Sequence, residues 1–138
     1  KEGHVNMKKI WTNGCFDILH IGHIKMLQYA ASLADKVIVG IDSDERVSRL
    51  KGADRPINNE QIRREILLSI RHVDEVYIFD SKQNMCDILR QQQIDEMIIG
   101  EEYRGRDITG SDVVSKIHFF PRIKGFSTTE IINATIRP

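Results

Sequence analysis

Residues 9–23 read KIWTNGCFDILHIGH, and this segment indicates the fold class of the chain. Lys9–Thr12 is a short apolar run that predicts a strand, whereas apolar residues recur at helical spacing from Gly22 to Leu33. A strand that leads through a glycine-containing loop into a helix is typical of an α/β fold. We expect the ligand site in this loop, because open α/β sheets bind ligands where strands end and helices begin.

Four further apolar runs predict the remaining strands. They are Lys36–Ile41, Glu75–Phe79, Glu96–Gly100 and Lys116–Phe120. Continuous apolar runs of this length suit strands that are buried on both faces of a parallel sheet. Since helical patterns separate these runs, the sequence predicts an α/β fold with right-handed crossovers.

Helical spacing is found in the segments between the strands. Apolar residues within 62–70 and at 88–89 mark two helices. Asn58, followed three residues later by Gln61, resembles a capping box at the start of the first of these. Residues 127–130 (STTE) match the capping box directly and predict a last helix.

The composition is that of a single globular domain, and it excludes several classes of protein. The 138 residues suit one domain, and 41% hydrophobic with 29% charged residues argues against disorder. The net charge is zero, so no overall field recruits nucleic acid or an anionic membrane. We expect a cytoplasmic domain over residues 7–138, with residues 1–6 a remnant of an added tag. Cys15 and Cys86 are too few for a disulfide framework and lack metal-ligand spacing.

Two histidines flank a glycine where the first helix should begin. A helix N-terminus offers free N–H groups and a positive dipole end to an anion, and Gly14 lets the backbone approach a phosphate closely. His20 and His23, spaced by three, can lie together there and donate to charge that develops on a phosphate. The competing interpretations are a surface or capping role, and a zinc site that lacks a third ligand. Neither G-x-x-x-x-G-K-[ST] nor G-x-G-x-x-G occurs, which argues against a P-loop kinase and a dinucleotide-binding dehydrogenase.

Residues 13–23 resemble the signature of the cytidylyltransferase-like nucleotidyltransferase superfamily, and further matches extend to residue 132. Two groups within it are similar to this chain. Segments 12–17, 49–52, 55–58, 78–80 and 109–113 resemble the adenylyltransferase that makes ADP-heptose. Segments 63–76, 100–103 and 121–129 resemble glycerol-3-phosphate cytidylyltransferases.

The resemblance implies a Rossmann-like five-stranded parallel sheet with helices on both faces, dependence on Mg²⁺, and a homodimer. It implies transfer of a nucleotidyl group from a nucleoside triphosphate to a small phosphorylated acceptor, with no nucleic acid or membrane partner. Heptose 1-phosphate adenylyl transfer is the favoured activity, and CTP with glycerol 3-phosphate is the alternative. A more remote alternative is a nucleotide-binding module that senses its ligand without turnover.

The resemblance also implies residue roles. The catalytic residues would be His20, His23, Lys51 and Arg122. The nucleotide would contact Asn13, Gly14, Cys15, Phe16, His20, Gly22, His23, Gly100, Arg122, Phe126, Ser127 and Thr128. The acceptor would contact Asp17, Lys51 and Arg63, and Asp17 would also be a metal ligand. The residues themselves leave simpler roles open: a solvated Lys51, an exposed helical ion pair at Arg63, and a plain helix cap at Ser127.

Overall fold

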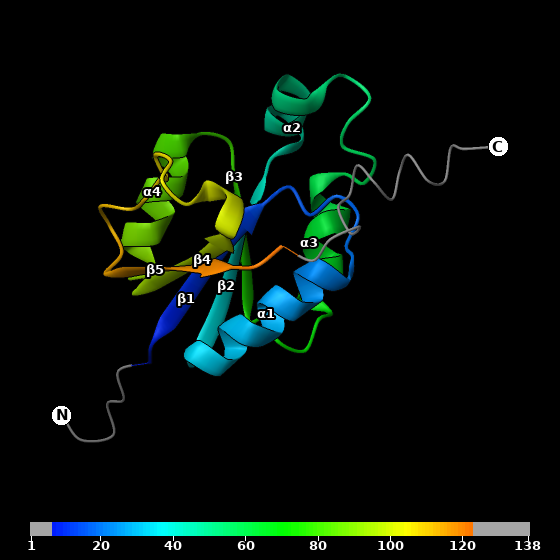
Figure 1. Cartoon of the computed structure of the whole chain (residues 1–138). Coiled ribbons are helices and arrows are strands. Elements are labelled where there is room, and N and C mark those ends of the chain that lie inside the picture. The colour runs from blue at the N-terminus through cyan, green and yellow to red at the C-terminus, as the bar shows by residue number, and fades with distance from the viewer. Residues whose placement is uncertain (1–6, 123–138) are drawn as a thin grey trace.

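Five parallel strands form one sheet in the computed structural model, which describes residues 7–122 (Figure 1). The strands are β1 (Lys9–Gly14), β2 (Lys36–Asp42), β3 (Glu75–Phe79), β4 (Glu96–Gly100) and β5 (Lys116–Phe120). All neighbouring strands are parallel, in the spatial order β3-β2-β1-β4-β5. The predicted sheet is therefore confirmed, with β1 and β2 extending beyond their predicted ends to Gly14 and Asp42.

Within residues 7–122, four α-helices connect the strands: α1 (Ile21–Leu33), α2 (Asp44–Lys51), α3 (Glu60–Leu68) and α4 (Lys82–Gln91). A short 3-10 helix, η1 (Glu101–Tyr103), follows β4. Helix α2 was not predicted from the sequence, and its single buried residue is Val47. The Ser43 side chain accepts a hydrogen bond from the Arg46 backbone N–H, and this N-cap starts the helix.

Helix α3 begins one residue later than the Asn58 cap predicts. Asn59 is the N-cap, and its side chain accepts a hydrogen bond from the backbone N–H of Ile62 at 2.9 Å. Asn58 is occupied elsewhere, because its backbone and side-chain N–H groups both donate to Asp17. The helix predicted at Ser127 lies outside the described residues.

The helices cover both faces of the sheet, as predicted: α1 and α3 pack on one face and α4 on the other (Figure 1). Alternate residues of β1 serve the two cores, so that Ile10 packs on the α1 side and Trp11 on the α4 side. The strand order reverses between β1 and β4, and ligands bind at such a switch point, beyond the carboxyl ends of the strands. Among residues 7–122, no helix is long and apolar enough to cross a membrane.

Candidate active site

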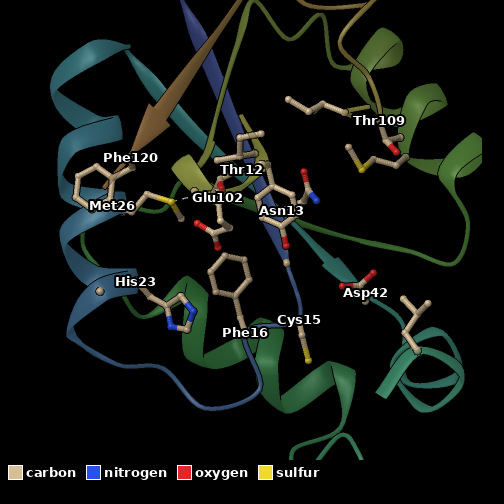
Figure 2. A pocket seen from close by; sticks show the side chains of 18 of the residues that line it. Thr12, Asn13, Cys15, Phe16, His23, Met26, Asp42, Glu102, Thr109 and Phe120 are labelled. Carbon is tan, nitrogen blue, oxygen red and sulfur yellow. Dashed lines mark hydrogen bonds between the residues drawn. The ribbon is translucent and has the colours of Figure 1, made fainter. Parts of the chain in front are cut away.

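A cleft of about 840 Å³ opens at the carboxyl ends of the strands (Figure 2). The loop after β1 lines its floor, and the loops after the other four strands supply its walls. The cleft brings together most of the predicted site residues: Asn13, Gly14, Cys15, Phe16, His20, Gly22, His23, Lys51, Gly100 and Arg122. Phe126, Ser127 and Thr128 lie outside the described residues.

The two histidines lock each other in place at the start of α1. His20 is the N-cap, and its Nδ1 atom accepts a hydrogen bond from the Gly22 backbone N–H at 3.1 Å. His23 Nδ1 accepts from the His20 backbone N–H at 3.2 Å, which completes a reciprocal capping box. The imidazole rings stack, with their centroids 3.8 Å apart and 27° between their planes.

These hydrogen bonds decide which ring nitrogen carries the proton. A ring nitrogen that accepts a hydrogen bond is unprotonated, so Nε2 is the N–H donor of His20 and of His23. The capping role, which the sequence left as an alternative to a catalytic one, is performed by Nδ1, and the ring N–H of each histidine is on Nε2. Capping and phosphate binding are therefore compatible in the same side chains.

The surroundings of His23 keep its imidazole neutral. Burial, followed by the nearby His20 and Lys51, lowers the pKa of His23 to about 3. The ring of Phe16 packs edge-on against it, with the centroids 4.9 Å apart. At neutral pH, His23 is a hydrogen-bond donor that carries no charge.

The loop between β1 and α1 is shaped by Phe16, which has a positive φ of 50°. This left-handed conformation is uncommon outside glycine and marks a constrained backbone. Its ring covers Gly14, where an added Cβ would lie 3.3 Å from Phe16 Cε2. Burial raises the pKa of the Cys15 thiol, which keeps it protonated and agrees with a packing role rather than a nucleophilic one.

Asp17 fixes a neighbouring loop. Its contacts differ from the metal or acceptor contacts that the resemblance implied. Its side chain is fully buried, and Oδ2 accepts from the Ile57 backbone N–H at 2.7 Å and from Arg55 Nε at 3.1 Å. Oδ1 accepts from the Asn58 backbone N–H at 2.8 Å. With both oxygens occupied and no exposed surface, the carboxylate fixes the segment that precedes α3.

Arg63 is likewise structural. This corrects two expectations for it, namely the acceptor contact that the resemblance implied and the exposed helical ion pair that the sequence left open. The residue is 1% exposed and does not line the cleft. Its guanidinium donates to the carbonyl oxygens of Asn58, Cys15 and Asp42 at 2.8–2.9 Å and to Asp44 Oδ1 at 2.8 Å. One buried side chain thus joins the histidine loop, the end of β2, the start of α2 and the segment before α3.

Several cleft residues were not predicted from the sequence. They are Asp42, Arg46, Phe79, Lys82, Met85, Tyr103, Asp107, Thr109 and Phe120. Each lies at the carboxyl end of a strand or in the segment that follows that strand. Glu102 also lines the cleft (Figure 2). Its carboxylate folds back onto Gly100, where an added Cβ would clash with Glu102 Oε1. Within the part of the chain that the structure describes, no three or more metal-ligating side chains cluster.

Comparison with known proteins agrees with this fold. Residues 11–134 match the model of the family described as cytidylyltransferase-like. The chain belongs to the cytidylyltransferase-like family. The matched region includes the loop Asn13–His23, which forms the floor of the cleft.

Relatives of this family member include larger proteins. It is 42% identical to the bifunctional protein HldE of Nitratiruptor sp. over 96% of its own length and 29% of the relative. It is 44% identical to HldE of Campylobacter jejuni serotype O:6 over 92% of its length and 28% of the relative. The chain therefore spans less than a third of these relatives. The lipopolysaccharide core biosynthesis protein of Thermoplasma volcanium shares the fold, with a TM-score of 0.72, 22% identity, and coverage of 86% of this chain and 99% of that one.

Proposed function

We propose that this domain transfers AMP from ATP to heptose 1-phosphate and releases pyrophosphate. The observation that carries the proposal is the pair of Nε2–H donors of His20 and His23, fixed at the N-terminus of α1 inside the cleft. The similarity to HldE over 96% of the chain supports the heptose-type acceptor among those that the motifs leave open.

In the proposed reaction an acceptor phosphate oxygen attacks the α-phosphorus of ATP. A new phosphorus–oxygen bond forms while the bond from the α-phosphorus to the bridging oxygen breaks, and pyrophosphate takes the electron pair. Negative charge grows on the α-phosphate oxygens and on the departing pyrophosphate. The two imidazole donors and the helix dipole face that charge, and each such preformed donor typically lowers the barrier by about 3 kcal/mol.

The cations of the cleft would hold the phosphates of the two substrates. Lys51 ends α2, which follows β2, and Arg122 follows β5, so they reach the cleft from opposite sides of β1. An arginine can bind two phosphate oxygens with its planar fork, whereas a lysine acts as a point charge. Bringing two anions within attack distance requires such charges on both sides of the α-phosphorus.

Mg²⁺ is part of this proposal, as a complex with the triphosphate. The ion is usually held by substrate phosphates and one or two carboxylates rather than by a complete protein cage, which fits a cleft with few carboxylates. Glu102 faces the cleft, and Asp42 also lines it, although its Oδ1 atom accepts from Arg46 Nε at 2.7 Å. When bound, the metal supplies neutralisation of the charge on the leaving pyrophosphate.

A second candidate is CTP with glycerol 3-phosphate. It is favoured by the segment 121–129, which resembles that group and whose first residues, Pro121 and Arg122, line the cleft. The two candidates share the histidine chemistry and differ in the base and the acceptor.

A matrix of substrates distinguishes these candidates. Each of the four nucleoside triphosphates is incubated with heptose 1-phosphate, glycerol 3-phosphate or simple alkyl phosphates and phosphonates, and pyrophosphate release is measured. We expect the highest kcat/KM for ATP with heptose 1-phosphate. A preference for CTP with glycerol 3-phosphate would replace the leading proposal, and binding of triphosphate without turnover of any pair would indicate a sensor module.

A further inference from the structure

The two faces of β1 present different chemistry to the cleft. Thr12 points to the α1 side, where its Oγ1 contacts Met26 Sδ at 4.0 Å. Trp11 and Asn13 flank it in the sequence and therefore point to the opposite, α4 side. Figure 2 shows the Asn13 side chain directed away from His23 and toward the side of Thr109.

The amide of Asn13 is fixed in orientation by a buried indole. Trp11 is fully buried, and its Nε1–H donates to Asn13 Oδ1 at 3.0 Å. An indole nitrogen is only a donor, so the oxygen of the amide must face it and the NH₂ group must point away. The conformation of the Trp11 side chain is restricted, because its ring lies directly over Gly40 and fills the space that a Cβ would occupy there.

The Asn13 NH₂ group is left for a ligand. Asn13 lines the cleft, and among the described residues its Nδ2 atom makes no hydrogen bond to the protein. On the same side of the sheet the cleft is lined by Phe79, by Lys82 and Met85 of α4, and by Thr109. Arg46 lies over the Phe79 ring and pairs with Asp42, and both line the cleft. This α4-side chamber therefore combines an apolar wall, the charge of Lys82, the Arg46–Asp42 ion pair and neutral polar groups.

The geometry of the reaction assigns this chamber to the second substrate. The attacking and leaving oxygens lie roughly in line across the phosphorus. If pyrophosphate leaves beside the histidines on the α1 side, the acceptor must approach from the α4 side. Lys82 then provides a charge for the acceptor phosphate, and a neutral NH₂ donor suits a hydroxyl oxygen.

We propose that Asn13 is a specificity-determining residue whose amide, oriented by Trp11, donates a hydrogen bond to a hydroxyl oxygen of the sugar phosphate acceptor. This inference rests on the proposed function. A site built to pair with a hydroxyl discriminates strongly against acceptors that lack it, because the buried polar group is then left unpaired.

Two substitutions test the hydrogen bond. Asn13→Ala removes the donor without adding charge, and Asn13→Asp keeps an acceptor for Trp11 while replacing the donor by a carboxylate oxygen. We expect the KM of heptose 1-phosphate to rise at least about tenfold in both variants. A tenfold rise corresponds to about 1.4 kcal/mol, which is the typical loss for one hydrogen bond. The KM of ATP should change less than about threefold in Asn13→Ala, which corresponds to less than about 0.7 kcal/mol of binding free energy.

Trp11 provides a readout that does not depend on turnover, since it is the only tryptophan of the chain. Its fluorescence should change saturably when heptose 1-phosphate is added in the presence of a non-hydrolysable ATP analogue, with weaker apparent binding in both variants. Gln91→Glu, an amide-to-carboxylate change on an exposed residue at the far end of α4, is the control and should match the wild type.

The outcomes separate this inference from the proposed function. No turnover of heptose 1-phosphate by the wild type would refute the proposed function itself. Normal turnover by the wild type with an unchanged acceptor KM in Asn13→Ala and Asn13→Asp would overturn the assignment of Asn13. Thermal melting of each variant identifies loss of fold, which would instead lower kcat without a selective rise in the acceptor KM.

Discussion

The proposed transition-state role of His23 can be separated from its capping role by two substitutions. His23 Nδ1 accepts the hydrogen bond that closes the capping box, and Nε2 is the donor toward the cleft. An asparagine places an oxygen near the position of Nδ1, so His23→Asn keeps the cap and loses the donor. A glutamine places its NH₂ group near the position of Nε2, so His23→Gln keeps a donor and loses the cap.

The expected magnitudes follow from these two roles. Loss of one donor to developing charge lowers kcat by roughly 100–1,000-fold, or about 3–4 kcal/mol. Loss of a helix cap costs about 1 kcal/mol of stability, which leaves a domain of ordinary stability (about 5–15 kcal/mol) almost entirely folded. We therefore expect His23→Asn to lose at least 100-fold in kcat at near wild-type stability, and His23→Gln to lose less kcat and more stability.

The assay is steady-state pyrophosphate release with ATP and the preferred acceptor, together with urea unfolding. His72→Ala is the matched control, because His72 lies between α3 and β3, at the end of the sheet opposite the cleft. If His23→Asn keeps near wild-type kcat, Nε2 of His23 is not a transition-state donor.

Four further predictions follow from the same structure. The pKa of His23 is about 3 in the folded chain and about 6.5 when unfolded, so the unfolded state takes up the extra proton as pH falls between these values. Stability is therefore lost with falling pH, by about 2 kcal/mol at pH 5 relative to pH 7, and urea unfolding should show this loss reduced in His23→Asn. Arg63→Met should cost about 3–5 kcal/mol of unfolding free energy, since it leaves Asp44 and three carbonyl oxygens without their donor; full stability with a raised acceptor KM would restore the substrate-binding interpretation. Gly40→Ala should destabilise by about 1–3 kcal/mol through overlap with Trp11 and lower the melting temperature, whereas an unchanged value would mean that the indole can move. A chelator should abolish turnover, Mg²⁺ should restore it, and elemental analysis should find no stoichiometric zinc.

The strands and the histidine pair were predictable because their signals are local. Each strand is a continuous apolar run, and burial on both faces of a parallel sheet selects that pattern. His20 and His23 lie three residues apart at a helix start, so their contact follows from helix geometry alone. Helix α2 was not predictable because it is short and polar. It buries a single side chain, that of Val47, and one buried residue produces no apolar periodicity.

The roles of Asp17 and Arg63 could not be predicted, because their partners come from distant segments. A charged residue is exposed by default, and neither spacing nor composition shows that four segments converge on one guanidinium. Arg63 bonds to residues 5 to 48 positions away, and Asp17 to residues about 40 positions away. Such a network appears only when the sheet order brings the ends of β1 and β2 together.

The Arg63 network also determines how this domain can be recombined with its relatives. Because a single guanidinium joins the histidine loop, the β2–α2 junction and the segment before α3, these three loops form one unit of exchange. In a chimera that imports only one of these loops, a carbonyl oxygen that accepts from Arg63 can be displaced. The buried guanidinium then lacks a hydrogen-bond partner, which destabilises the fold. Loop grafts that aim at a new acceptor should therefore move the three segments together.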